Sequence, residues 1–255
     1  MITASCPTNV PPPRSTPRPT LPPSLDAAST AGMKLIIGNK AYSSWSLRGW
    51  LACKQSGLLF EEVVVPMYDA DWEKRRSGDE FAPSSGKVPI LWDGDAVVWD
   101  SLAIVDYLAD KVGRERFWPE DNAARAMARS MAAEMHSSFA ALRRKHSMNV
   151  RQVFPARTPD DDVLVELQRV MEIWAQARAR FGGGGDFLFG QFGAADIMFA
   201  PLVTRIVTYQ LPIARFATGY MQAMFEHPFM QDWIAAAQEE EWVLEQFEQS
   251  VPTPA

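Results

Sequence analysis

The sequence has little cysteine, few histidines and no long apolar run. Cys6 and Cys53 are its only cysteines, which excludes a disulfide scaffold and is typical of a reducing cytoplasm. No uninterrupted apolar stretch approaches the roughly 18 residues that cross a bilayer, so we expect a soluble, cytoplasmic protein without a membrane span. Two cysteines and three scattered histidines offer no metal-ligand spacing, so we expect no metal.

Positive charge is also scarce. No five Lys or Arg residues are consecutive, and the net charge is −6. A general nucleic-acid binder needs a basic surface, so we expect no nucleic-acid partner. The chain of 255 residues is instead 47% hydrophobic, which is enough for one or two globular domains with hydrophobic cores.

Residues 1–32 differ in composition from the rest of the chain. They hold eight of the 19 prolines and no aromatic residue, so they cannot bury enough apolar area to offset the entropy of ordering. They contain no apolar segment of a secretory signal. We expect a disordered extension, or a reading frame that truly starts at Met33, in preference to a proline-rich ligand segment.

Residues 33–112 alternate strand and helix patterns. β-rich runs occur at 35–37, 60–65, 87–92 and 96–99, and Asp93-Gly94 is a two-residue turn between the last two. Helical spacing of apolar residues follows the first run and recurs at 101–111. The order β-α-β, hairpin, α predicts a small mixed sheet covered by helices.

After a linker at 113–122, the pattern is purely helical over 123–248. Apolar residues recur every three or four positions from Met127 to Leu142, which predicts one helix over 123–145, about 35 Å long. Because 194–207 is apolar on nearly all sides, we expect it to be a buried central helix. Further helices are expected over 160–181, 219–225 and 228–239.

A serine-rich segment, residues 42–48, lies where the first helix begins. A hydroxyl of Ser43 or Ser44 there would sit beside unpaired backbone N–H groups, where a donated hydrogen bond lowers the pKa of a thiol. Either serine could equally be only an N-cap. A serine nucleophile is disfavoured because there is no G-x-S-x-G motif and no histidine in this domain.

Two further segments of the first domain could carry chemistry. Val88-Pro89 enters a strand; a trans proline on an edge strand is the simpler interpretation, whereas a cis bond would free backbone groups to pair with an extended peptide. Asp100-Ser101 begins a helix. Ser101 can cap that helix, or its hydroxyl can hold a ligand carboxylate while Asp100 takes an ammonium group.

In this order, ahead of an all-α domain, the segments resemble cytosolic glutathione transferases. The resemblance covers about residues 34–247. The motifs that carry it are Tyr42-Ser43-Ser44-x-Ser46-x-Arg48, Gly86-Lys87-Val88-Pro89-Ile90-Leu91, Asp100-Ser101-x-Ala103-Ile104-x-x-Tyr107-Leu108, Phe189-Gly190-x-x-Gly193-x-Ala195-Asp196 with Ala200-Pro201, and His227-Pro228-x-x-x-x-Trp233. The first motif is most similar to the zeta class and related bacterial enzymes of serine type.

The resemblance implies a thioredoxin-like domain over 33–112, an all-α substrate domain over 123–248, a homodimer and glutathione as cosubstrate. Ser43, with Ser44 beside it, would activate the glutathione thiol for attack on a small hydrophobic electrophile, as in detoxification. Val88 would pair through its backbone with the cysteinyl unit, and Asp100 and Ser101 would hold the γ-glutamyl end. The implied glutathione-binding residues are Lys87, Val88, Pro89, Asp100 and Ser101.

Two positions depart from the family pattern. Trp45 stands where the zeta class commonly has cysteine, which weakens a maleylacetoacetate isomerase-like interpretation. Gly193 stands where the buried-helix motif usually has Ser or Thr, although glycine also caps acceptably.

The second substrate is expected where the two domains meet. Its candidate pocket residues are Trp45, Met135, His136 and Phe139, although a Met and Phe stripe at helical spacing is more often core. The leading hypothesis is a glutathione transferase. A glutathione-dependent cis-trans isomerase is the alternative among enzymes, and a non-catalytic binding protein of the same fold is the alternative outside them.

Overall fold

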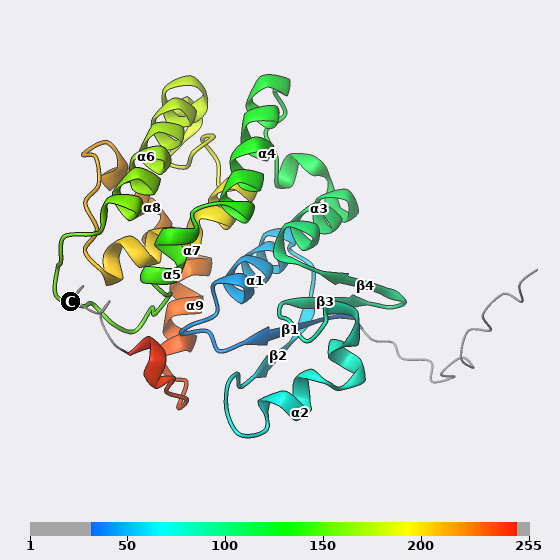
Figure 1. Ribbon diagram of the computed structural model, residues 1–255. Helices are drawn as coiled ribbons and strands as arrows, with labels where there is room; N and C mark the ends of the chain where they lie inside the picture. The colour runs from blue at the N-terminus through cyan, green and yellow to red at the C-terminus, as the bar shows by residue number, and fades with distance from the viewer. Residues whose placement is uncertain (1–31, 249–255) are drawn as a thin grey trace, which may run out of the picture. The chain divides into compact units, whose positions relative to one another are not determined.

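The computed structural model describes residues 32–248 (Figure 1). The extension expected at 1–32 lies outside these residues, apart from Gly32. The first part of the chain alternates strands and helices. Its elements are β1 (Met33–Gly38), α1 (Ser44–Ser56), β2 (Phe60–Val65), α2 (Trp72–Arg76), a 3-10 helix (Asp79–Ser84), β3 (Ile90–Asp93), β4 (Ala96–Trp99) and α3 (Ser101–Val112).

The four strands form one mixed sheet in the order β2-β1-β3-β4. β1 is parallel to β2 and antiparallel to β3, and β3 and β4 form a hairpin. Leu35 and Ile37 of β1 belong to the core shared with α1 and α3, whereas Ile36 packs with Trp72 of α2 on the other face. Both faces of the sheet are therefore covered, which explains why residues 35–37 of β1 are a continuous apolar run.

The second part of the chain is helical. Its elements are 3-10 helices at Arg114–Arg116, Gly182–Gly184 and Glu245–Phe247, and helices α4 (Asn122–Ser137), α5 (Ala140–Lys145), α6 (Asp161–Phe181), α7 (Ala194–Thr208), α8 (Ala217–Glu226) and α9 (Pro228–Gln238). Nearly every residue of α7 is buried, because α7 packs against α1, α4 and α8. Within 32–248, no helix has both the length and the apolar character needed to cross a bilayer. The expected fold class, an α/β domain followed by an all-α domain, is confirmed.

The prediction of a single helix over 123–145 is wrong. Phe139 has a left-handed backbone (φ 62°) between α4 and α5. Glu166 of α6 is the physical reason for the new helix, because its carboxylate accepts from the N–H groups of Ala141 and Leu142 at 3.1 and 2.7 Å. Apolar spacing continues through the break, so periodicity alone cannot show it.

The contacts at the start of α7 explain why position 193 is glycine. The Asp196 carboxylate accepts from the N–H of Gly193 at 3.0 Å and from that of Leu188 at 3.1 Å. A Cβ at position 193 would lie 2.7 Å from the carbonyl oxygen of Phe117, which already accepts from the N–H of Ala194. Serine or threonine would therefore displace the backbone, so glycine suits this helix start.

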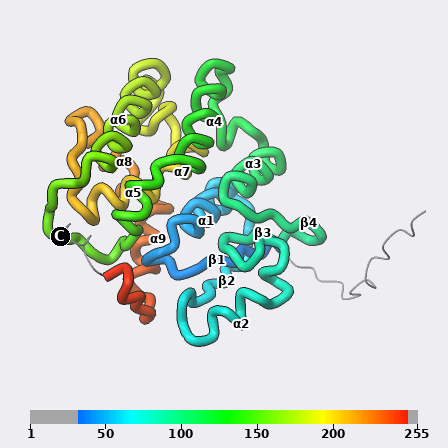
Figure 2. The backbone as a smooth tube through the Cα atoms, viewed as in Figure 1, coloured from blue at the N-terminus to red at the C-terminus, as the bar shows by residue number. Residues whose placement is uncertain are grey.

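The helical part is anchored at the beginning of α1. Arg48 is fully buried, and its Nε donates to the carbonyl oxygen of Met198 in α7 at 2.9 Å. Trp233 Nε1 of α9 donates to the carbonyl oxygen of Lys40, just before α1, at 3.1 Å. Figure 2 shows the chain returning to the same place after α9, where Glu240 contacts the loop before α1. Both parts of the chain therefore position that loop.

Candidate functional site

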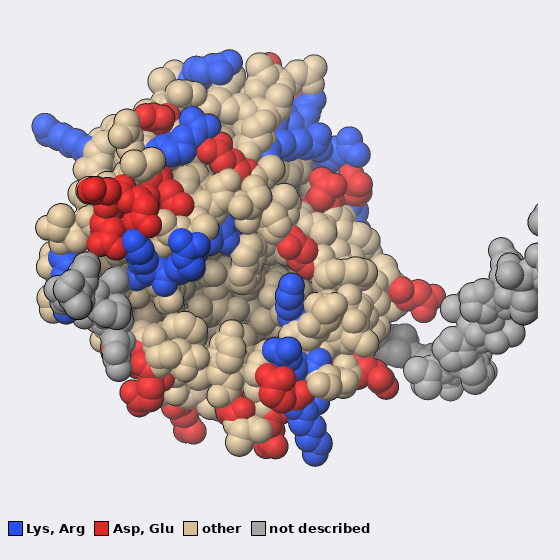
Figure 3. Space-filling view, in the orientation of Figure 1, with Lys and Arg blue, Asp and Glu red and all other residues tan. Residues whose placement is uncertain are grey.

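A cavity of about 740 Å³ opens where the loop before α1, the loop before β3 and the start of α3 meet. This volume suits a small-molecule ligand. Acidic and basic side chains are interspersed over the face of the molecule drawn in Figure 3, so that face offers no continuous surface of one sign. The cavity is lined by residues of all three predicted segments, namely Ser43, Ser44, Lys87, Val88, Pro89, Asp100 and Ser101.

Ser43 is the N-cap of α1. Its Oγ accepts from the N–H of Ser46 at 3.3 Å and lies 2.8 Å from Ser46 Oγ. Ser46 is fully buried, and its Oγ accepts from the N–H of Gly38, at the end of β1, at 2.9 Å. A hydroxyl donates one proton and accepts on two lone pairs, so Ser46 can donate to Ser43 and leave the Ser43 proton for a ligand.

Ser44 is the first residue of α1 and also lines the cavity. Among residues 32–248, its hydroxyl has no hydrogen-bond partner, in contrast to that of Ser43. Ser46 belongs to the serine-rich motif, although the sequence alone assigns it no role. Its place one helical turn after Ser43 is the signal that identifies it, since an N-cap bonds to the residue three positions on.

The start of α3 places a second hydroxyl on the cavity wall. Asp100 has a positive φ of 76° and caps the helix, because its Oδ1 accepts from the N–H of Leu102 at 2.9 Å. Ser101 is fully buried, and its Oγ has no partner within the described chain. Buried polar atoms are nearly always hydrogen-bonded, so an unpaired hydroxyl beside a cavity indicates a ligand or water contact.

The loop before β3 has free backbone groups. The Val88–Pro89 peptide bond is cis, where the sequence alone favoured trans, and β3 lies inside the sheet and not at its edge. Ser84 fixes the preceding turn, because its Oγ accepts from the N–H of Lys87 at 3.0 Å. Across 32–248, the N–H and C=O of Val88 make no backbone hydrogen bond, so both can pair with an extended ligand.

Trp45 and His136 form the wall beside Asp100. His136 Nε2 of α4 lies 3.3 Å from Asp100 Oδ2, and its ring meets the Trp45 ring edge-on, with centroids 5.3 Å apart. The guanidinium groups of Arg48 and Arg143 lie 4.7 and 4.9 Å from the Trp45 ring centroid. Burial, reinforced by repulsion from Arg143, lowers the pKa of Arg48 well below its ordinary value.

Met135 and Phe139 do not line this cavity. Met135 has no exposed surface and Phe139 only 4%, and both belong to the hydrophobic core. Phe139 is the residue at the break between α4 and α5. Their assignment to a second-substrate pocket stays a prediction, and neither residue belongs to the lining of this cavity.

Two aromatic residues that were not predicted from the sequence, Tyr68 and Phe247, complete the wall beside Tyr42. The Phe247 ring lies 5.7 Å from that of Tyr42 and 6.2 Å from that of Tyr68, and all three residues line the cavity. Burial raises the pKa of Tyr42 above its ordinary value, and the hydrogen bond with Glu248 adds to this shift. No local sequence pattern predicts Phe247 as a lining residue, because the chain returns to the site only after α9.

Both parts of the chain match known family models. Residues 42–111 match "Glutathione S-transferase, N-terminal domain", and residues 123–236 match "Glutathione S-transferase, C-terminal domain". The chain belongs to the glutathione S-transferase family. The expectation of an enzyme of the glutathione transferase family is confirmed at this level, whereas the zeta-class relationship stays a prediction.

Individual relatives agree with the family. "Glutathione S-transferase 1" of Dianthus caryophyllus is 25% identical over 202 residues, covering 75% of this chain and 86% of the relative. "Glutathione S-transferase GstB" of Escherichia coli K12 is 25% identical over 174 residues, covering 64% and 81%. A Burkholderia glutathione transferase homologue solved with bound glutathione has a TM-score of 0.61 at 19% identity, covering 82% of this chain and 100% of that one. At this identity the structural likeness supports the fold.

Proposed function

We propose that the protein binds glutathione in the cavity and joins the tripeptide, through its sulfur, to an apolar electrophile. The observation that carries the proposal is the Ser101 hydroxyl, which is fully buried beside the cavity without a partner. A ligand carboxylate supplies the acceptor that this hydroxyl lacks, and the N–H groups at the start of α3 favour the same negative charge.

Other residues of the cavity lining suit the remaining groups of the tripeptide. The Asp100 carboxylate is suited to the ammonium group of the γ-glutamyl unit. The unpaired N–H and C=O of Val88 are suited to the cysteinyl backbone, and the exposed Lys87 beside them is of the right sign for the glycyl carboxylate. This arrangement directs the thiol to the start of α1, where Ser43 and Ser44 lie.

Ser43 activates the thiol in this proposal. The N–H of Gly38 bonds to Ser46, Ser46 donates to Ser43, and Ser43 donates to sulfur, so each hydrogen bond polarises the next. Together with the positive end of α1, this series of hydrogen bonds favours the thiolate over the thiol, whose ordinary pKa is about 8.5. The thiol proton goes to solvent. A sulfur lone pair then forms the C–S bond, and the leaving group departs with its bonding electrons.

Titration of the purified protein with glutathione tests the proposal. We expect calorimetric binding, thiolate absorption in the ultraviolet at pH 7, and conjugation of 1-chloro-2,4-dinitrobenzene. S-methylglutathione is the matched control, because it lacks the ionisable proton and should bind without thiolate absorption. Absence of both binding and thiolate absorption would overturn the function, and binding without ionisation would overturn the role of the serine.

A further inference from the structure

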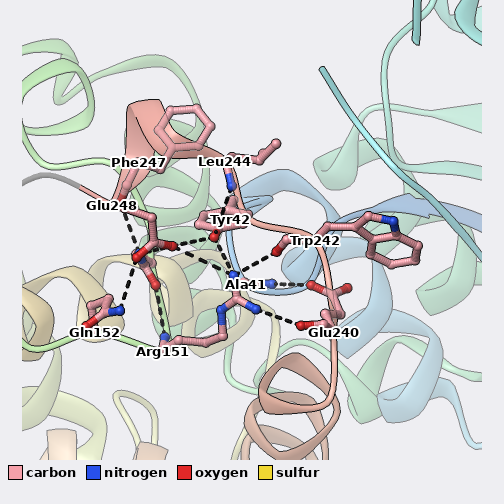
Figure 4. Close-up of polar contacts among 10 residues, drawn as sticks. Ala41, Tyr42, Arg151, Gln152, Glu240, Trp242, Leu244, Phe247 and Glu248 are labelled. Atoms are coloured by element: carbon pink, nitrogen blue, oxygen red, sulfur yellow. Dashed lines mark hydrogen bonds and ion pairs between the residues drawn. The ribbon is translucent and has the colours of Figure 1, made fainter. Parts of the chain in front are cut away.

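The loop that carries Ser43 is held by the far end of the chain. This loop, residues 39–43, connects β1 to α1, and residues 240–248 pack across it (Figures 2 and 4). We call residues 240–248 the C-terminal clamp. Only Phe247 of the clamp lines the cavity, so its polar contacts serve the loop and not a ligand.

Glu240 makes the central contact of the clamp. One oxygen of its carboxylate accepts from the N–H of Lys40 at 2.6 Å, and the other accepts from the N–H of Ala41 at 3.0 Å. Two successive backbone donors thus bind the two oxygens of one carboxylate, which fixes the loop in position and in orientation. Burial raises the pKa of Glu240, and these two hydrogen bonds oppose that shift.

Tyr42 is the second contact between the clamp and the loop (Figure 4). Its hydroxyl accepts from the N–H of Leu244 at 3.3 Å and also bonds to Glu248 and Arg151. Arg151 donates in turn to the carbonyl oxygen of Glu240 at 2.8 Å. The residue directly before Ser43 is therefore tied to the clamp through its side chain.

Other backbone groups of the loop are also paired. The carbonyl oxygen of Asn39 accepts from the N–H groups of Tyr42 and Ser43 at 3.2 and 2.9 Å, and that of Ala41 accepts from the N–H of Val150 at 3.1 Å. Without Glu240, the N–H groups of Lys40 and Ala41 would be the ones left unpaired. Loss of these two hydrogen bonds would loosen Lys40 and Ala41, which lie inside the turn that ends in Ser43.

We propose that Glu240 is a positioning residue for thiol activation: it holds the loop so that the Ser43 hydroxyl meets the glutathione sulfur. The inference rests on the proposed function. A displacement of about 1 Å at a reacting group can cost about 10²-fold in rate. The other proposed contacts of the tripeptide lie at Val88, in the loop before β3, and at Ser101, at the start of α3, and in the described part of the chain the clamp makes no hydrogen bond to either residue.

Glu240→Gln tests this role with little change of shape. An amide NH₂ cannot accept a hydrogen bond, so one loop N–H loses its partner. We expect kcat for 1-chloro-2,4-dinitrobenzene to fall at least ten-fold and the bound thiol to ionise at a higher pH, seen as later thiolate absorption in a pH titration. The Kd for glutathione should stay within about two-fold, since its anchoring groups are unchanged.

The matched control is Glu241→Gln, which removes the same charge from an exposed neighbour and should behave as wild type. A Glu240→Gln protein with wild-type kcat and wild-type thiol ionisation overturns the inference. So does a loss of glutathione affinity that equals the loss of kcat, because that would indicate general disruption of the site.

Glu240→Asp decides the matter if Glu240→Gln does not fold. It keeps the carboxylate but shortens the side chain by one methylene, so the two oxygens can no longer reach both loop N–H groups. Thiol ionisation at a higher pH with unchanged glutathione affinity supports the inference, and unchanged ionisation overturns it. Failure of the proposed function is distinct, because the wild-type protein itself would then neither bind nor ionise glutathione.

Discussion

At the start of α1 the Ser43 hydroxyl caps the helix, whereas at the start of α3 Asp100 does the capping and the neighbouring Ser101 hydroxyl has no partner. Both helix starts line the same cavity. Both segments place a serine where a strand or loop ends and a helix begins. A sequence pattern alone therefore cannot distinguish a serine that caps the helix from one whose hydroxyl stays unpaired.

The difference separates a hydroxyl that stabilises the fold from one that we propose binds a ligand. The Ser43 hydroxyl accepts a hydrogen bond from the N–H of Ser46. Removing this hydroxyl should therefore lower the stability of α1 as well as the catalytic rate. The buried Ser101 hydroxyl satisfies nothing in the described chain, so the free protein carries it at a cost in free energy. Substitutions at the two positions should therefore change the stability of the free protein in opposite directions.

The largest expected effect is that of Ser43→Ala on catalysis. Without the hydroxyl, the glutathione sulfur loses its hydrogen-bond donor, so kcat/KM for 1-chloro-2,4-dinitrobenzene should fall ten-fold or more. Loss of the N-cap should also lower the free energy of unfolding by about 1 kcal/mol, measured by urea denaturation. Ser44→Ala is the control, because it changes the next residue without removing the cap. If Ser44→Ala gives the larger loss of kcat/KM, the activating hydroxyl is that of Ser44.

Local pattern was enough to predict the fold class and the segments around the cavity. Strand and helix periods, the Asp93-Gly94 turn and the hydroxyls at helix starts are all short-range signals. The cavity lining contains the predicted segments at Ser43-Ser44, Val88-Pro89 and Asp100-Ser101. The cis bond before β3 and the central place of β3 in the sheet were not predicted, because both depend on which strands pair.

Long-range contacts account for the parts that local pattern missed. Glu166 of α6 starts α5 and so ends the helix predicted through Phe139. Glu240 reaches the loop before α1 from the other end of the chain. Neither contact has a period or a motif, because each depends on how distant segments fold together.

A smaller effect is expected for Ser101→Ala. The substitution removes the proposed partner of the γ-glutamyl carboxylate, so the Kd for glutathione should rise about five-fold, as for loss of one hydrogen bond. Thiol ionisation at saturating glutathione should not change, because Ser101 lies at the other end of the tripeptide. The free protein should be as stable as wild type or more stable by up to about 1 kcal/mol, since an unpaired buried hydroxyl is gone. Unaltered affinity in a calorimetric titration would contradict the assignment of Ser101.

The smallest effect is expected for Asp100→Asn, which keeps the cap and removes the charge. Asparagine retains an oxygen for the N–H of Leu102 and tolerates a positive φ, so urea denaturation should show a change of less than about 0.5 kcal/mol. The Asp100 side chain is 43% exposed and is shared with His136, so its pairing with the γ-glutamyl ammonium group contributes modestly, and the Kd for glutathione should rise about two- to three-fold. A glutathione analogue without that ammonium group is the control, because it should bind Asp100→Asn and wild type equally. An equal loss of affinity for both ligands would instead mean that Asp100 acts through the conformation at the start of α3. It would then contradict the proposal that Asp100 and Ser101 bind different groups of glutathione.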